Sequence, residues 1–90
     1  MPASSEATVT LTGDLHARPA GALSMAAARY AAEIVLVAGG REANAKSVLA
    51  VMQLGASSGQ PVTVRAAGAD AAAAVAAVTE ALTAATKVGD

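Results

Sequence analysis

The sequence predicts a two-layer α+β domain with the element order β-α-β-β-α-β-α. Four stretches show the polar–apolar alternation or the short apolar run of a β-strand, and three others have apolar residues at helical spacing. Gly39-Gly40 lies between two of the strands and suits a tight hairpin turn. Hairpins and strands with one polar face indicate an antiparallel sheet that helices cover on one side.

The first strand is expected over residues 7–12, where two large apolar residues alternate with three threonines. Gly13-Asp14 ends it and leads into a loop. A helix should then run from Ala17 to about Ala31, with apolar positions at Leu23, Ala26, Ala27 and Tyr30. Alanines and Gly21 leave a narrow helix face that allows a close approach to the element it covers.

The remaining strands follow from their patterns. Residues 33–38 are continuously apolar after Glu33, which indicates a central strand. Arg41–Ala43 is short and charged, as an edge strand usually is. Residues 62–66 alternate again and form the fourth strand.

Two further helices complete the order. One covers about residues 47–54, begins at a cap provided by Asn44 or Ser47, and stops at Gly55. We expect Val51 and Leu54 to be its core residues.

The last helix runs from about Ala71 to Thr86. Asp70 is a candidate N-cap, and Lys87 is favourably placed at the C-terminal end of the helix dipole. The stripe that faces the core is Val75, Val78 and Leu82.

The length of 90 residues corresponds to a single domain, residues 1–90, of which we expect residues 1–6 to form a loosely ordered N-terminus. Alanine dominates and Tyr30 is the only aromatic residue, so the core should be thinly packed with closely approaching helices. The net charge of -1 does not suit a disordered chain.

The composition argues against several classes of protein. There are no cysteines and there is one histidine, so we expect no disulfide, no metal site and no cofactor. The near-neutral charge gives no reason to expect nucleic-acid binding. The N-terminus lacks the pattern of a signal peptide, and no run is apolar enough to span a bilayer. We therefore expect a cytoplasmic protein without membrane insertion.

The stretch from Gly13 to Gly21 concentrates the candidate chemistry. It holds His16, with Arg18 two residues later and Pro19 next. Proline suits the first turn of a helix, so His16 should lie at or just before a helix start, where free N–H groups and the helix dipole favour an anion. Arg18 adds a charge that matches phosphate oxygens. A nucleophilic imidazole beside an anion seat is suited to receiving a phosphoryl group, although a lone histidine there is more often a capping or surface residue.

The stretch Leu15-His16-Ala17-Arg18-Pro19-Ala20 resembles the active-site motif of HPr, the histidine-containing phosphocarrier family of the bacterial sugar phosphotransferase system. A second block, from Asn44-Ala45-Lys46-Ser47 through Met52 to Leu54-Gly55, resembles the family's second signature. The similarity covers Val9 to about Leu82. It implies an open-faced sandwich with a four-stranded antiparallel sheet of order 1-4-2-3 and three helices on one face.

The resemblance also implies a function. His16 would accept a phosphoryl group on Nδ1 from phosphorylated Enzyme I, ultimately from phosphoenolpyruvate, and pass it to sugar-specific IIA domains. Arg18 would support the phosphate, with the backbone N–H groups of Ala17 and Arg18. The protein would then be a monomeric carrier and not an enzyme.

Further residues receive roles from the same resemblance. Ser47 would be a regulatory phosphoserine, modified by an HPr kinase/phosphorylase, while the residue type alone indicates a helix N-cap. Leu49 and Met52 are expected on the surface. The residues that would contact Enzyme I and IIA domains are Ala17, Gly21, Val48, Leu49, Met52 and Gln53.

Asp14 stands where the family usually has glycine, and its charge is expected to act against an incoming phosphate or to raise the pKa of His16. A regulatory or nitrogen-branch HPr paralogue is an alternative function. More distant alternatives are a small acylphosphatase, which would use Arg18 and Asn44 and leave His16 idle, and a ligand-binding module of the amino-acid-sensing kind.

Overall fold

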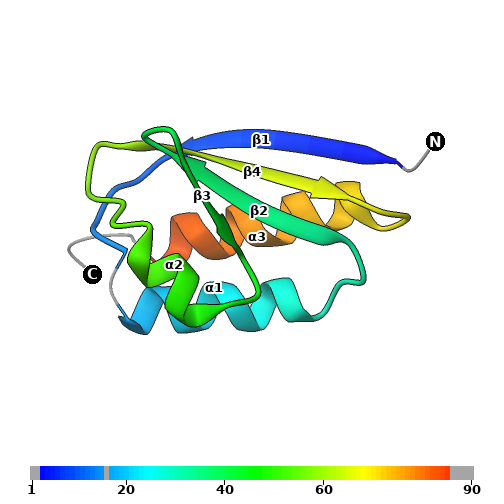
Figure 1. Ribbon diagram of the computed structural model, residues 1–90, viewed down its shortest axis with the longest axis horizontal. Coiled ribbons are helices and arrows are strands. Elements are labelled where there is room, and N and C mark those ends of the chain that lie inside the picture. Colours follow the sequence, from blue (N-terminus) through cyan, green and yellow to red (C-terminus); the bar gives the residue numbers. More distant parts are fainter. Residues whose placement is uncertain (1–2, 16, 86–90) are drawn as a thin grey trace.

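The computed structural model describes residues 3–15 and 17–85. It has the predicted element order (Figure 1). The elements are β1 (Ser4–Thr10), α1 (Ala17–Ala28), β2 (Glu33–Ala38), β3 (Arg41–Asn44), α2 (Val48–Gln53), β4 (Pro61–Ala67) and α3 (Ala71–Ala85). The predictions for Lys87 and for the end of the last helix at Thr86 concern positions outside the described residues, as does any prediction for residue 16.

The four strands form one antiparallel sheet in the order β1-β4-β2-β3. This confirms the order 1-4-2-3 that the resemblance implied. The β2–β3 hairpin turns at Gly39 and Gly40, whose φ angles of 57° and 78° are those of a turn that glycine adopts without strain. The central strands β2 and β4 place buried side chains opposite each other: Leu36 of β2 pairs with Val64 of β4, and both are buried.

The first strand differs from the expectation at both ends. Ser4, Ser5 and Glu6 belong to β1 and pair with the last residues of β4, so the prediction of a loose segment over residues 1–6 is wrong for these three. The full length of β4 offers them backbone partners, and their polar side chains suit the solvent-exposed positions of an edge strand. The strand ends at Thr10, because the next pair keeps only one of its two ladder bonds: the Leu11 N–H donates to the Gln60 carbonyl at 3.0 Å, but the Gln60 N–H donates to the Ser57 carbonyl instead of returning to Leu11.

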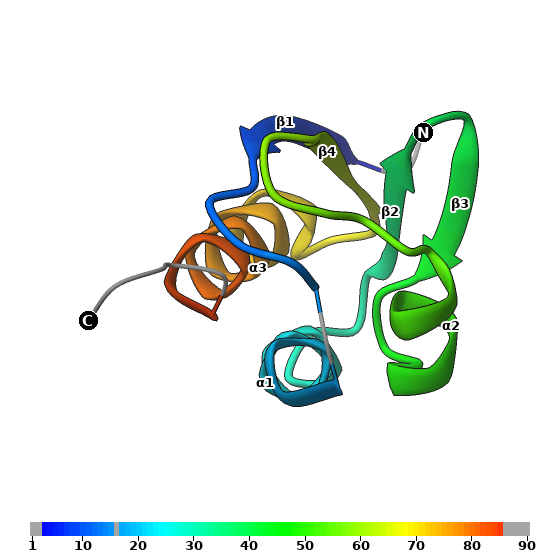
Figure 2. The same cartoon turned by 90° about the vertical axis from the view of Figure 1, so that its left-hand side faces the viewer.

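All three helices lie on one face of the sheet (Figure 2). α3 packs under β1 and β4, and α2 lies at the β3 side. α1 packs against both of the other helices. Within the described residues, no helix is both long and apolar enough to cross a membrane.

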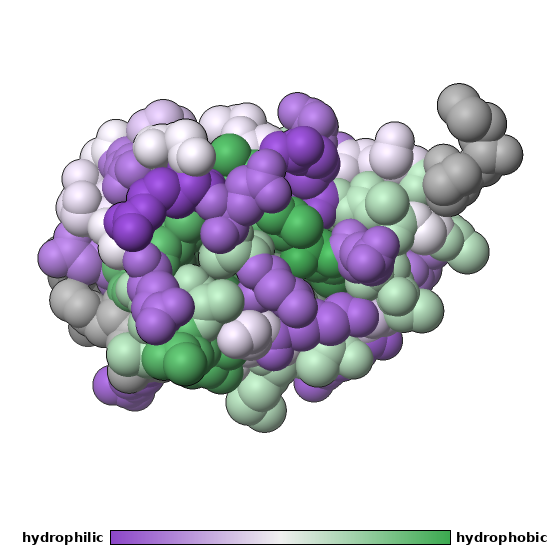
Figure 3. All heavy atoms as spheres, viewed as in Figure 1, coloured by the Kyte–Doolittle hydropathy of each residue, from purple (hydrophilic) through white to green (hydrophobic). Residues whose placement is uncertain are grey.

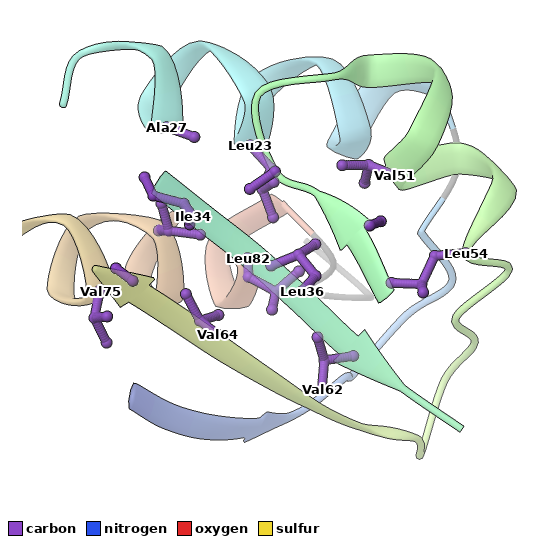
Figure 4. Close-up of a cluster of buried hydrophobic side chains, with 14 of the residues drawn as sticks. Leu23, Ala27, Ile34, Leu36, Val51, Leu54, Val62, Val64, Val75 and Leu82 are labelled. Atoms are coloured by element: carbon purple, nitrogen blue, oxygen red, sulfur yellow. The ribbon is translucent and has the colours of Figure 1, made fainter. Parts of the chain in front are cut away.

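The core between the layers is built from aliphatic side chains (Figure 4). Its largest fully buried members are Leu11, Leu23, Ile34, Leu36, Leu82, Val51, Val62, Val64 and Val78. On α1 the close approach comes from Ala20, Ser24 and Ala27, all buried, and the Ser24 hydroxyl has no hydrogen-bond partner among the described residues. The expected contribution of Gly21 to this face is wrong, because a Cβ at Gly21 would point into open space.

The turn after α1 is held by two charged side chains. α1 ends at Ala28, three residues before the predicted end, because the N–H groups of Ala31 and Ala32 donate to the Asp70 carboxylate at 2.8 and 2.9 Å. Lys46 Nζ donates to the Tyr30 carbonyl at 2.6 Å. Asp70 directly precedes α3, where it was expected as the N-cap, and its carbonyl accepts from the Ala74 N–H at 2.9 Å, but its carboxylate accepts from the turn after α1.

These bonds make the stability of the fold depend on the charge of Asp70. The N–H of Ala31 is the main cause that holds the pKa of Asp70 below its usual value, against a smaller desolvation effect, with help from the N–H of Ala32 and the charge of Lys46. A lowered folded-state pKa stabilises the fold fully above the unfolded pKa of about 4, and this contribution is lost as the pH falls through the folded value.

We therefore expect Asp70→Asn to lower the melting temperature at neutral pH and to lower it less as the pH falls below about 4. An amide offers one acceptor atom where the carboxylate offers two. Thermal unfolding of both proteins between pH 7 and pH 2 measures the difference. Glu80→Gln, on the exposed side of α3, is the control: its melting temperature should not show a difference from wild type that becomes smaller as the pH falls. A difference between Asp70→Asn and wild type that stays constant with pH would contradict the interpretation.

Candidate phosphoryl-acceptor site

The predicted acceptor, His16, lies outside the described residues, but the chain on both sides of it is described. Leu15 is buried, and its N–H donates to the Ala56 carbonyl at 3.1 Å. α1 begins immediately afterwards, at Ala17. Residue 16 therefore stands between a buried, hydrogen-bonded leucine and the first residue of a helix, which confirms the prediction of a helix start at this point.

The first turn of α1 has the properties of an anion seat. The N–H groups of Ala17 and Arg18 are among those that have no acceptor within a helix, and the positive end of the dipole lies here. Pro19, the third residue, has no N–H and is buried. Arg18 is exposed, and no described residue pairs with its guanidinium. As far as the described residues go, the Arg18 charge is therefore available to a ligand.

Ser47 is the N-cap of α2, as its residue type predicted. It has an extended backbone, its Oγ accepts from the Ala50 N–H at 3.2 Å, and its carbonyl accepts from Val51 N–H at 3.0 Å. The turn before it is fixed by Asn44, whose Oδ1 accepts from the Lys46 N–H at 3.0 Å. Asn44 is therefore used to shape the start of α2, which does not favour the phosphate-binding role that an acylphosphatase would give it.

An apolar surface lies on α2. Val48, Leu49 and Met52 are exposed to 40%, 65% and 41%, and we call these three residues the α2 patch. Val51 and Leu54, on the other side of the helix, are buried. The predicted surface positions of Leu49 and Met52 and the predicted core positions of Val51 and Leu54 are thus confirmed. Figure 3 shows an apolar region at lower left, where α2 lies in front of α1.

The sequence-based reasoning missed one residue of this surface. Met25 of α1 is 73% exposed, the largest exposure of any large apolar side chain in the described chain. It follows Arg18 and Gly21 at spacings of seven and four residues, so all three share the face of α1 opposite to its core stripe. This helical spacing is the feature of the sequence from which the exposed position of Met25 could have been predicted. Gly21 itself is half-buried, and Gln53 at the end of α2 is exposed.

The site and the patch are neighbours. α1 packs against α2; Figure 1 shows α2 at the N-terminal half of α1, and Figure 2 shows the two helices side by side. A partner that covers the α2 patch would therefore also reach the first turn of α1. Asp14 is the described acidic residue that lies nearest to residue 16 in the sequence. Its Oδ1 accepts from the Ser58 N–H at 2.8 Å.

A metal centre has no support in the described part of the chain, where no three potential ligand side chains from His, Cys, Asp or Glu come together. The start of α1 offers the N–H groups of its first turn and the Arg18 guanidinium to an anion. Such a set binds oxyanions and supplies no general acid of its own apart from the imidazole.

Comparison with known proteins agrees with this geometry. The family model described as the HPr component phosphorylation site of the phosphotransferase system matches residues 3–84. A histidine-containing phosphocarrier protein of Mycoplasma is 32% identical with a TM-score of 0.81, and the match covers 97% of this chain and 100% of that one. The phosphocarrier protein HPr of Bacillus anthracis is 30% identical with a TM-score of 0.83, over 90% and 99% of the two chains.

A third similar structure has a different role. Crh, a catabolite repression protein of Bacillus subtilis that forms an intertwined dimer by domain swapping, is 32% identical with a TM-score of 0.73, over 91% and 92% of the two chains. The sequence identity to Crh is therefore as high as the identity to the two phosphocarrier proteins, and it does not distinguish between them. The family match over most of the chain, the sheet order and the helix start after residue 16 agree with one another: the chain belongs to the HPr family of phosphocarrier proteins of the phosphotransferase system.

Proposed function

We propose that His16 accepts a phosphoryl group from phosphorylated Enzyme I, which is itself charged by phosphoenolpyruvate, and transfers it to IIA domains of sugar uptake. The observation that carries the proposal is the start of α1 directly after residue 16, with an exposed Arg18 that no described residue engages. A phosphoryl group on residue 16 would meet N–H groups and a guanidinium already in place.

The transfer needs no cofactor. The lone pair of Nδ1 of the neutral imidazole attacks phosphorus, a new N–P bond forms, and the bond from phosphorus to the donor breaks, with its electron pair staying on the donor. Transfer to a IIA domain reverses the roles, because Nδ1 is then the leaving group. The N–H groups of Ala17 and Arg18 and the Arg18 guanidinium stabilise the three phosphoryl oxygens during both steps.

The test uses phosphoenolpyruvate with a labelled phosphoryl group and catalytic Enzyme I. We expect the wild-type protein to gain one acid-labile label and His16→Ala to gain none, while His16→Ala keeps its melting temperature. Arg18→Ala should still be labelled but about ten- to a hundredfold more slowly, because a hydrogen bond to a charged group contributes about 1.5–3 kcal/mol. Substantial labelling of His16→Ala would contradict the proposal.

The partner surface in this proposal is the α2 patch together with Ala17, Gly21 and Gln53. An exposed group of large apolar side chains on so small a protein indicates a contact surface. Its position beside the first turn of α1 would let one docked partner cover both the patch and residue 16.

Leu49→Glu should raise the KM for Enzyme I about tenfold or more, because a buried apolar contact is replaced by a charge that must be desolvated. The melting temperature should change little, since Leu49 is 65% exposed. Ala76→Glu, at an exposed position of α3, adds the same charge away from the patch and is the control. Unfolding of Leu49→Glu, or an unchanged KM, would show that the patch is not the docking surface.

We also propose that Ser47 is a regulatory phosphorylation site for an HPr kinase/phosphorylase. Its hydroxyl lies at the start of α2, next to Val48 and Leu49 in the sequence. A phosphate there would carry nearly two negative charges, which the N-terminal end of the helix tolerates and an apolar interface does not. The modification would therefore slow transfer from Enzyme I without unfolding the protein.

Ser47→Asp should keep a melting temperature near that of the wild type, because aspartate is also a good N-cap, and should slow phosphorylation by Enzyme I several-fold. Ser47→Asn is the matched control, since it caps the helix without a charge. Equal rates for Ser47→Asp and wild type would leave Ser47 with a capping role alone, and equally slow rates for both variants would exclude charge as the cause.

The second candidate is a regulatory or nitrogen-branch carrier, and the similarity to Crh favours its consideration. Such a protein would accept phosphate in the same way or be controlled through Ser47, but would serve other partners. Transfer from the phosphorylated protein to a panel of IIA domains separates the two functions: a sugar carrier phosphorylates several sugar-specific domains, and a nitrogen-branch carrier does not.

A further inference from the structure

The segment before residue 16 runs beside the loop that joins α2 to β4. At one end, the Gly59 N–H donates to the Leu11 carbonyl at 2.8 Å. At the other end, the Leu15 N–H donates to the Ala56 carbonyl at 3.1 Å. Leu11 and Leu15 are both buried, so the two ends of this segment are fixed by burial as well as by backbone bonds.

Between these ends, the Asp14 side chain forms a hydrogen bond to the loop, and this bond requires a side chain with an acceptor at position 14. Its Oδ1 accepts from the Ser58 N–H at 2.8 Å, across 44 positions of sequence. Hydrogen bonds to an ionised acceptor are about twice as strong as neutral ones. Any residue except proline can make the backbone bonds at Leu11 and Leu15, but glycine or alanine at position 14 could not make this one.

The donor is presented by a tight turn. The Gln60 N–H donates to the Ser57 carbonyl at 3.0 Å, and Gly59 has a φ of +86°, which together match a type II turn with Ser58 in its second position. The N–H at that position takes no part in the turn's own hydrogen bond. It is therefore available to the Asp14 carboxylate, and the turn keeps it in place.

We propose that Asp14 is a positioning residue for phosphoryl transfer: its bond to Ser58 fixes the backbone that leads into residue 16 and the first turn of α1. This rests on the proposed function. The loop that holds Ser58 begins directly after α2, so the same bond links the helix that bears the α2 patch to the acceptor segment. On this basis the Asp14 charge is directed to a backbone N–H of the neighbouring loop, and its effect on transfer is favourable.

The test measures kcat and KM for phosphorylation by Enzyme I in three single variants and one double variant. Asp14→Ala removes the acceptor. Ser58→Pro removes the donor N–H, and proline is favoured at this position of a type II turn, so the turn is kept. Asp14→Asn keeps an oxygen that can accept the same bond and removes the charge.

We expect Asp14→Ala and Ser58→Pro each to lower kcat about tenfold with KM unchanged within about twofold, because a small misplacement of reacting groups slows transfer strongly. The double variant should be no slower than either single one. Asp14→Asn should recover most of kcat. All rates are measured well below the melting temperature of each variant, so that loss of folded protein does not contribute.

Three results would overturn the inference. Unchanged kcat in Asp14→Ala would show that the bond does not position the acceptor. Independent losses in Asp14→Ala and Ser58→Pro that add in the double variant would show that the two residues do not act through one bond. An Asp14→Asn variant as slow as Asp14→Ala would assign the effect to charge. Failure of the wild type to take up phosphate would instead refute the proposed function.

Discussion

The close packing of small side chains between the helices and the sheet is the constraint on which the rest of this structure depends. With one aromatic residue in the chain, water can be excluded only where the backbones approach closely, and α1, which packs against α2 and α3, buries the small residues Ala20, Ser24 and Ala27. The larger core side chains come mainly from the strands and α3 (Figure 4). In so small a core, every large apolar side chain left outside is a loss of burial. The exposure of Leu49, Met52 and Met25 therefore brings no benefit to folding, and the proposed docking of partners would account for it.

The position of the site follows from the same packing. α1 begins at Ala17, directly after residue 16, and the first buried alanine on its core-facing side is Ala20. The segment before it is buried at Leu15 and bonded to the α2–β4 loop, while the turn after α1 is held by Asp70 and Lys46. Both ends of α1 are thus fixed by contacts with distant parts of the chain. A helix held in this way can present its N-terminal N–H groups to an anion without rearrangement, which is the property that electrostatic stabilisation of a transferring group requires.

Much of the fold could be predicted from periodicity, because the strands alternate and the helices have clear apolar stripes. The predictions were wrong where contacts with residues far along the chain determine the bounds of an element. Ser4–Glu6 became ordered because β4 extends beside them, and α1 ended early because Asp70, far along the chain, accepts from Ala31 and Ala32. The sheet order came from family resemblance, since pairing between β1 and β4 leaves no local signal. At the site, Arg18 and the α2 patch were identified from the sequence, whereas Met25 was missed and the partner of Asp14 depends on a loop 44 residues away.

The most direct test of the account is to locate the phosphoryl group in the phosphorylated protein by ³¹P and ¹H–¹⁵N NMR. We expect phosphorus bonded to Nδ1 of His16, together with large shifts of the Ala17 and Arg18 backbone N–H signals as these groups donate to the phosphoryl oxygens, and little change in the amides of the sheet. A phosphoryl group on any other residue would contradict the claim that His16 is the acceptor. Phosphohistidine formation without a response of the Ala17 and Arg18 amides would contradict the claim that the start of α1 is the anion seat.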